Sequence, residues 1–144
     1  GNRPVVFDSP WGKVGLAICY DLRFSELFLD LVNLGAKMIF VPSAFTEATG
    51  RDHWDLLVRT RAVETQCYLV AANQGGRHSK KLRTWGETMI VDPWGRVLDK
   101  VGKGQGMAIA NLDMSDVDRV RANIPIKSHR EAAQKRAVRI TQAD

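Results

Sequence analysis

Short apolar runs alternate with segments of helical spacing over the first half of the chain. Three runs have the length and composition of buried strands: residues 13–18, 37–41 and 66–72. Between them, residues 26–34 and 53–65 carry apolar side chains at helical spacing. Because each predicted strand is joined to the next by a helix, the order predicts a parallel sheet in an α/β fold.

Turn and capping residues mark the ends of these elements. A short apolar run at residues 5–7 is separated from the strand beginning at Lys13 by the turn sequence 8–12, which predicts a β-hairpin. Ser25 is predicted to cap the first helix, and Gly35 is predicted to end it.

The second half of the chain has a different pattern, typical of short antiparallel strands. The strands predicted here are residues 84–91, 96–101 and 106–112. A helix is predicted over residues 114–121, with Asp113 or Ser115 as its cap, and a surface helix or arm is predicted from Glu131 onward. No internal repeat or linker divides the chain, so residues 1–144 are predicted to form one domain.

Composition narrows the class of protein and of partner. The net charge of +5 is concentrated in residues 77–83 and at the C-terminal end. Aromatic residues do not alternate with these basic residues, so a solvated loop is favoured and no nucleic-acid partner is expected. No apolar run reaches about 18 residues, so no membrane partner is expected. The two cysteines, Cys19 and Cys67, fit no metal motif and are read as reduced thiols of a cytoplasmic protein without a signal peptide.

Cys19 stands where a predicted buried strand meets the turn before the first helix. A thiol at such a turn lies close to backbone N–H groups and to a helix N-terminus, which favour a thiolate. The backbone N–H of Tyr20 is placed to stabilise an oxyanion, as at a nucleophile elbow. The pattern therefore makes Cys19 a candidate nucleophile, although a cysteine in an apolar run is more often a core residue.

Three segments should meet at one edge of the predicted sheet. Cys19, the loop 43–50 and the segment 73–76 each follow a predicted parallel strand. Ligands of such sheets bind beyond the carboxyl ends of the strands, so this edge is the predicted site.

The residues around Cys19 resemble the nucleophile motif of the nitrilase superfamily, the carbon–nitrogen hydrolases. The motif is GLAICYDLRFSE at residues 15–26. The similarity continues in the family's order through PSAF at 42–45, RAVETQCY at 61–68, AANQ at 71–74 and MIVDPWG at 89–95. Within the superfamily the chain is most similar to the Nit branch, which holds deaminated-glutathione amidases and omega-amidases.

The resemblance implies that this chain is only the C-terminal half of a four-layer α-β-β-α sandwich. The family's catalytic set is a Glu base, a Lys that stabilises the tetrahedral intermediate, and the Cys nucleophile. Glu and Lys lie upstream of the Cys, but only 18 residues precede Cys19 and they contain Lys13 and no glutamate. We therefore expect an exposed apolar sheet face, and we expect the missing N-terminal half to be a partner chain or segment.

The resemblance also implies a chemistry and a set of site residues. Cys19 would attack an amide carbon, an amine would leave, and water would hydrolyse the thioester. Arg23 would bind a substrate carboxylate; a structural salt bridge to Glu26 or Glu64 is the equally weighted alternative. Phe45 and Thr49 would line the substrate pocket, with ordinary loop packing as their alternative.

The remaining polar residues are predicted to have structural roles. Glu64 is expected to support the second helix together with Arg61, and His53 and Trp54 are expected to pack in the core.

Three functions remain open on the sequence alone. The first is an amidase that acts on a small-molecule ω-amide without a cofactor or metal, as part of a homo-oligomer. The second is a truncated binding or scaffold module, and the third is a redox-sensing thiol protein. Within the enzyme class, nitrile and carbamoyl hydrolysis use the same catalytic residues and stay open.

Overall fold

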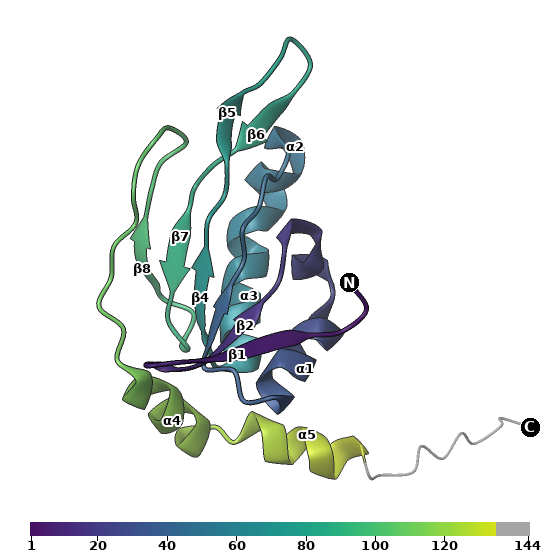
Figure 1. The fold of residues 1–144 in the computed structure, drawn as a ribbon, viewed down its shortest axis with the longest axis vertical. Coiled ribbons are helices and arrows are strands. Elements are labelled where there is room, and N and C mark those ends of the chain that lie inside the picture. Colours follow the sequence, from purple (N-terminus) through teal and green to yellow (C-terminus); the bar gives the residue numbers. More distant parts are fainter. Residues whose placement is uncertain (135–144) are drawn as a thin grey trace, which may run out of the picture.

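The computed structural model describes residues 1–134 and contains a six-stranded sheet with helices and a separate two-stranded hairpin (Figure 1). The strands are β1 (Val5–Ser9), β2 (Gly12–Leu16), β3 (Met38–Phe40), β4 (Tyr68–Ala71), β5 (Gly75–Arg77), β6 (Arg83–Trp85), β7 (Met89–Val91) and β8 (Val97–Lys100). The helices are α1 (Ser25–Asn33), α2 (Glu47–Thr49), α3 (Asp55–Thr65), α4 (Met114–Asn123) and α5 (Ile126–Gln134), with a 3-10 turn η1 (Cys19–Arg23) and a π turn η2 (Gly50–Trp54). Of the surface helix or arm predicted from Glu131 onward, residues 131–134 form the end of α5, and the rest lies outside the described residues.

The parallel centre of the sheet is confirmed. The strand order is β1-β2-β3-β4-β7-β8, and the β2–β3 and β3–β4 pairs are parallel. The β1–β2 hairpin is antiparallel as predicted, and β7 and β8 extend the other edge as antiparallel strands. The carboxyl ends of β2, β3 and β4 therefore meet at one edge, where the sequence predicted the site.

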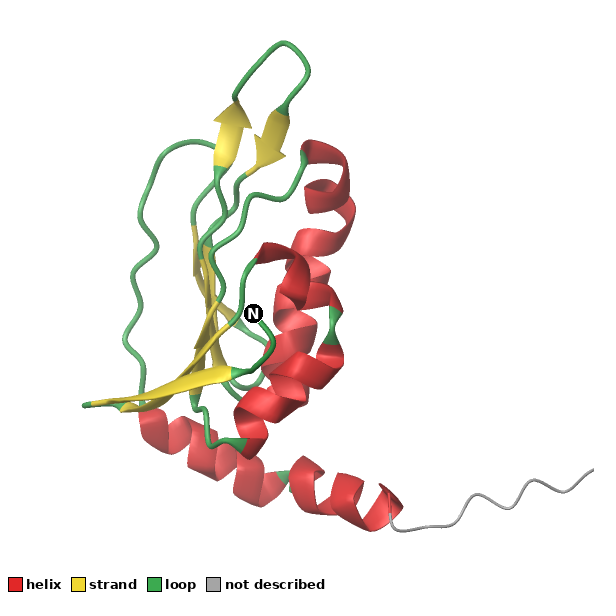
Figure 2. Ribbon diagram, turned by 45° about the vertical axis from the view of Figure 1, so that its right-hand side comes forward, coloured by secondary structure: helices red, strands yellow, loops and turns green. Residues whose placement is uncertain are grey.

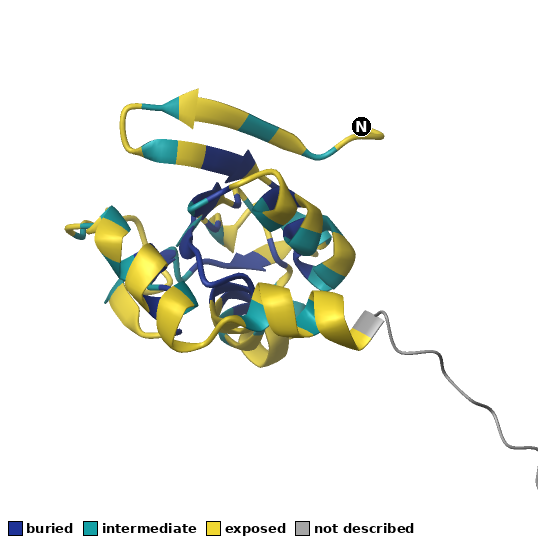
Figure 3. Cartoon of the chain, turned by 90° about the horizontal axis from the view of Figure 1, so that it is seen from below, coloured by how far each residue is buried: buried dark blue, intermediate teal, exposed yellow. Residues whose placement is uncertain are grey.

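One face of the sheet carries the core. Helices α1 and α3 cover this face, and the other face is left largely bare (Figure 2). Buried residues gather between the sheet and these helices, whereas the β1–β2 hairpin is mostly exposed (Figure 3). Gly15 lets α1 approach, since a Cβ at this position would lie only 3.2 Å from Leu31 Cδ1. The core on this face is complete without any further chain.

Several predicted boundaries are wrong for identifiable reasons. Ser25 is the first helical residue, because Phe24 takes the N-cap position and makes no side-chain cap bond. The predicted strand 84–91 is broken between β6 and β7, where Gly86 and Glu87 have positive φ values of 82° and 61°. The loop 43–50 contains the helical turn α2.

The predicted strand 106–112 does not form within the described chain. Its side chains Met107 and Ile109 are 78% and 72% exposed, and the backbone N–H of Ile109 donates to Asp99 Oδ2 at 2.7 Å. An extended segment needs a neighbouring strand to form a ladder. Among residues 1–134 no such strand lies beside it, so the alternating apolar side chains point to solvent.

Helix α4 covers one end of the second sheet face. The Asp113 carboxylate accepts a hydrogen bond from the Ser115 N–H at 2.9 Å, which confirms Asp113 as the cap. Val117 of α4 packs against side chains of β2, β3 and β4, and the Tyr68 hydroxyl donates to the Asp113 carbonyl and to Asp116 Oδ2 at 3.1 and 3.2 Å. These contacts fix α4 across the amino ends of the parallel strands.

The rest of the second face is an open apolar surface. The strand register places Val5, Leu16, Phe40, Val70 and Ile90 in one row across five strands. Paired residues point to the same side of a sheet, so the row shares one face. Leu16 and Phe40, at its centre, are 41% and 37% exposed. The exposed apolar face expected from the sequence is therefore present in this chain.

Alkaline pH should weaken the docking of α4 through Tyr68. Burial, with the Asp116 carboxylate nearby, raises the pKa of Tyr68 to about 12 from its ordinary value of 10.0. The folded chain therefore holds this proton at pH values where the unfolded chain has lost it, so stability falls as pH rises from about 10 toward 12. Urea unfolding across this range should show a steeper fall for the native chain than for Tyr68→Phe, and parallel pH profiles would contradict this.

The open face should cause the isolated chain to self-associate. Replacing Leu16 and Phe40 by serine removes exposed apolar surface at the centre of the face without opening the core. Sedimentation velocity should then show fewer large species than for the native chain, at unchanged far-UV circular dichroism. Leu34→Ser with Leu82→Ser is the matched control, because both leucines are exposed away from this face. An equal effect of both pairs would show that the face has no special role.

Candidate active site

Cys19 begins a tight turn at the carboxyl end of β2 with a strained backbone. Its φ is +47°, a left-handed value that residues with a side chain rarely adopt. The Cys19 N–H donates to the Pro42 carbonyl at 2.9 Å, and Asp21 Oδ2 accepts from the Ile18 N–H at 2.8 Å. The turn is thus held from both sides, and the thiol lies partly buried against the core. A strained, over-determined nucleophile turn is a known device of hydrolases.

The Tyr20 N–H is available for an incoming group. The next residue, Asp21, donates its N–H to the Ile18 carbonyl at 2.9 Å, which closes the turn. Among residues 1–134 no acceptor is paired with the Tyr20 N–H. The role of this N–H as an oxyanion donor stays a prediction.

The three segments predicted to meet at this edge do meet. The Ser43 N–H donates to the Ala72 carbonyl at 2.8 Å, and the Gln74 N–H donates to the Ser43 carbonyl at 2.9 Å. Asn73 adds a buried amide bridge: its Oδ1 accepts from the Phe45 N–H at 3.0 Å and its Nδ2 donates to the Gly86 carbonyl at 2.6 Å. The loops beside Cys19 are therefore fixed to the sheet by backbone and amide hydrogen bonds.

Arg23 ends the same turn and forms no ion pair among the described residues. Neither of the two carboxylates considered as its partners, Glu26 and Glu64, pairs with it within residues 1–134, and Glu64 binds Arg61 at 2.7 Å. The guanidinium instead lies over the rings of Tyr20 and Phe45, 5.3 and 5.4 Å from their centroids. Its Nη1 and Nη2 donate to His53 Nδ1 at 3.3 and 3.4 Å. The charge of Arg23 thus remains available to an anionic ligand.

Phe45 and Thr49 belong to the loop after β3, but they differ in accessibility. Phe45 is only 4% exposed and packs edge-on against Trp54, with ring centroids 5.1 Å apart. It therefore serves as a platform beneath Arg23 in this chain. Thr49 is partly exposed, and its hydroxyl is paired with that of Thr46 at 2.9 Å. Their contact with a substrate stays a prediction.

His53 is not the core residue that the sequence predicted, whereas Trp54 is. Trp54 is fully buried, and its Nε1 donates to the Glu87 carbonyl at 2.7 Å. The preceding His53 is exposed and reaches Arg23, thirty residues earlier in the chain. Helical spacing fails here because the first turn is a π turn, which changes the face on which each residue lies.

A buried arginine braces the turn that holds Cys19. Arg61 of α3 donates from Nε to the Leu22 carbonyl at 2.9 Å and from Nη1 to Glu64 Oε2 at 2.7 Å. Its guanidinium also lies 5.5 Å from the centre of the Phe28 ring. Glu64 orients Arg61, and Arg61 fixes the position of the η1 backbone relative to α3.

Within residues 1–134, no hydrogen bond joins Cys19 Sγ to a carboxylate, a histidine or a lysine. The other cysteine, Cys67, does form hydrogen bonds through its sulfur. Cys67 Sγ contacts the Ala36 and Thr65 carbonyls and the Arg121 guanidinium. Burial raises the pKa of the Cys67 thiol, so it is inert. Lys13 is paired with Asp8 at 2.8 Å and lies at the far end of β2. No cluster of His, Cys, Asp and Glu within residues 1–134 could hold a metal ion.

The comparisons with known proteins identify the family. The family model described as "Carbon-nitrogen hydrolase" matches residues 1–122. The chain belongs to the carbon-nitrogen hydrolase family. The deaminated glutathione amidase of Bos taurus is 49% identical over 122 residues, which are 85% of this chain and 37% of that protein. Such relatives place the chain in the Nit branch, as the resemblance indicated, and the chain spans little more than a third of their length.

Solved structures of the carbon-nitrogen hydrolases agree with the fold. The NitFhit protein of C. elegans has a TM-score of 0.89 and 44% identity, covering 94% of this chain and 33% of that one. A mutant of the amidase from Nesterenkonia, whose active-site cysteine carries the acetamide moiety of fluoroacetamide, has a TM-score of 0.71 and 27% identity, covering 91% of this chain and 48% of that one. The mixed α/β chain is thus a partial nitrilase-type fold.

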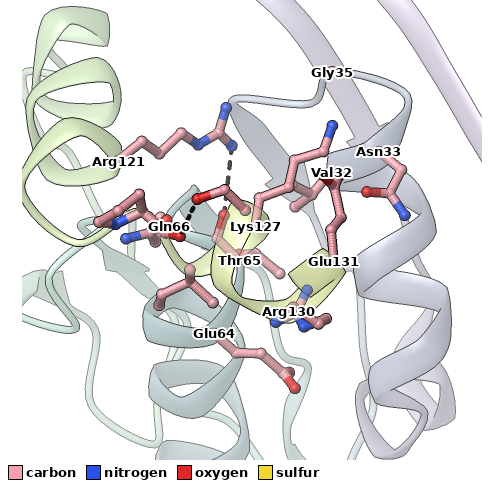
Figure 4. Close-up of a pocket in the computed structure, with 13 residues that line it drawn as sticks. Val32, Asn33, Gly35, Glu64, Thr65, Gln66, Arg121, Lys127, Arg130 and Glu131 are labelled. Carbon is pink, nitrogen blue, oxygen red and sulfur yellow. Dashed lines mark hydrogen bonds between the residues drawn. The ribbon is translucent and has the colours of Figure 1, made fainter. Parts of the chain in front are cut away.

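A cavity of about 540 Å³ lies at the opposite edge of the sheet from Cys19. It is enclosed by the ends of α1 and α3 and by α4 and α5, and Figure 4 shows Arg121 reaching over Thr65 at its wall. Thr65 and Gly35 precede the parallel strands, so this cavity is at the amino ends of the strands. Its location is not the one at which α/β sheets bind ligands.

Within residues 1–134, no helix is long and apolar enough to cross a membrane.

Removing the Arg61 brace should destabilise this hydrolase chain. Arg61→Met leaves the Leu22 carbonyl and Glu64 without their donor, which should lower the free energy of unfolding by about 2–3 kcal/mol. Arg59→Met is the matched control on the same helix, because Arg59 is exposed, and it should cost less than about 1 kcal/mol. Urea unfolding followed by tryptophan fluorescence measures both. Equal losses for the two variants would show that the brace is not needed.

Proposed function

We propose that this chain is the C-terminal half of an amidase that uses Cys19 to hydrolyse a non-peptide amide bond of a small molecule. The observation that carries the proposal is the strained Cys19 turn, which is tied to Pro42 at the carboxyl edge of the sheet. The Nesterenkonia amidase, which carries a covalent adduct on its active-site cysteine, supports the same role for this thiol.

The proposed reaction has two steps. Cys19 Sγ attacks the amide carbon, the C–N bond breaks, and the nitrogen leaves as ammonia or an amine with the proton that a base has taken from the thiol. Water then attacks the thioester and releases the carboxylic acid, while the sulfur regains a proton. The Tyr20 N–H lies beside the thiol and would donate to the oxygen of each tetrahedral intermediate.

The substrate class we propose is an ω-amide that also carries a carboxylate. Arg23 supports this choice, because its guanidinium has no carboxylate partner among the described residues and lies between two aromatic rings. Phe45 would form the apolar floor below the substrate, and the Thr49 hydroxyl would bind a carboxylate or carbonyl. The relatives named deaminated glutathione amidase fit this class. Nitrile or carbamoyl hydrolysis by the same residues is the alternative chemistry.

The missing half of the fold completes the proposed enzyme. The Glu base and the Lys of the family's catalytic set would come from an N-terminal segment or chain that covers the open row containing Leu16 and Phe40. Without them the thiol lacks the base and the lysine of the family's catalytic set, so the 144-residue chain alone should be almost inactive.

Self-association of the completed protein is a further part of the proposal. Leu56 and Val63 on the outer side of α3 are exposed, together with Trp94 of the turn after β7. These three side chains line one surface cavity of about 630 Å³. An apolar surface of this kind on the side away from the sheet supports a homo-oligomer.

Activity should require both halves and Cys19. The chain expressed with the upstream Glu- and Lys-bearing segment should release ammonia from an α-keto ω-amide, and the chain alone should be slower by at least about 10²–10³-fold. Cys19→Ala in the longer protein should abolish turnover, whereas the buried Cys67→Ala serves as the matched control and should retain it. Full activity of Cys19→Ala, or of the chain alone, would refute the proposal.

A further inference from the structure

The exposed side chain of His53 contacts the guanidinium of Arg23. Both terminal nitrogens of Arg23 converge on His53 Nδ1, at 3.3 and 3.4 Å. A histidine on a solvent-facing turn has no packing role here, since the core position is taken by Trp54. What His53 contributes is an acceptor for the guanidinium.

The chemistry of the two side chains assigns their roles in this contact. Arginine only donates hydrogen bonds, so His53 Nδ1 must be the acceptor. The lone pair of Nδ1 therefore faces the guanidinium.

The fold presents His53 to Arg23 through the π turn. Gly50, the first residue of η2, lies against Trp85, where a Cβ would collide with the indole. Trp54, the last residue of η2, is held by its bond to the Glu87 carbonyl and by its edge contact with Phe45. Between these two fixed points His53 projects toward the turn that begins at Cys19.

We propose that His53 is a positioning residue for Arg23: its Nδ1 holds the guanidinium over the Phe45 ring, in the orientation that receives the substrate carboxylate. This inference rests on the proposed function, in which Arg23 binds that carboxylate. Two N–H groups of Arg23 point to His53, and the remaining donors of the guanidinium stay available for the substrate.

The other charged groups near His53 are paired with each other. Asp52 and Arg51 flank it on η2 and bind each other at 2.9 Å. Glu47 of α2 is paired with Arg83 at 3.5 Å. Within residues 1–134, the side-chain acceptor that faces the Arg23 guanidinium is therefore His53 Nδ1.

The inference is tested by the kinetics of the longer protein, in which the chain is joined to the proposed Glu- and Lys-bearing segment. Two substrates are compared, an α-keto ω-amide and an uncharged amide of the same chain length. His53→Leu removes the acceptor and should raise KM for the carboxylate substrate about 10-fold at pH 8, with kcat changed less than about twofold. KM for the uncharged amide should stay unchanged. His53→Gln keeps an acceptor oxygen, so it should restore KM for the carboxylate substrate.

Two controls separate this role from others. His129→Leu removes an exposed histidine on α5 and should change neither KM. Arg23→Gln should raise KM for the carboxylate substrate alone. If Arg23→Gln does so and His53→Leu does not, the role of His53 is refuted while the proposed function stands. An equal rise for both substrates, or no rescue of KM by His53→Gln, also refutes it, and a longer protein inactive on both amides overturns both proposals.

Discussion

The left-handed backbone of Cys19 is the constraint on which the candidate site depends. A non-glycine residue in this conformation costs about 1–3 kcal/mol and persists only when its surroundings enforce it. Here the enforcing contacts are the Pro42 carbonyl, the Asp21 carboxylate and the Arg61 guanidinium, which binds the Leu22 carbonyl. They come from the next strand, from the turn itself and from α3. The position of one thiol is thereby coupled to the parallel sheet and to the helix packed on it.

The two faces of the sheet have opposite properties, and this asymmetry explains the rest of the molecule. The face under α1 and α3 has a complete core, so the Cys19 edge can be built by this chain alone. The other face is covered only at its end by α4 and otherwise leaves Leu16 and Phe40 partly exposed. The described part of the chain therefore holds the candidate nucleophile and a candidate carboxylate-binding arginine, which fits part of a carbon-nitrogen hydrolase.

The sequence predicted the features that depend on local pattern. The β1–β2 hairpin, the parallel centre and the meeting of three loops at one edge follow from short apolar runs, turn residues and helical connections. The family resemblance predicted the open face, because it implied that the chain is one half of the fold. These features need no knowledge of individual side-chain contacts.

Features set by contacts distant in sequence were not predictable. Residues 106–112 have the alternation of a strand, but a strand also requires a neighbour, and the described chain supplies none. His53 was assigned to the core from helical spacing, and the π turn that exposes it depends on the contact of Gly50 with Trp85. The amide bridge of Asn73 and the Arg23–His53 contact likewise arise only when separate segments meet.

The central claim is that Cys19 is the residue that carries the acyl group. The most direct measurement is rapid-quench mass spectrometry of the full-length protein, mixed with an α-keto ω-amide and quenched at low pH, followed by peptide mapping. The account predicts a transient acyl adduct on the peptide that contains Cys19 and none on the peptide that contains Cys67. An adduct on another residue, or turnover without any adduct on Cys19 at every time point, would contradict it.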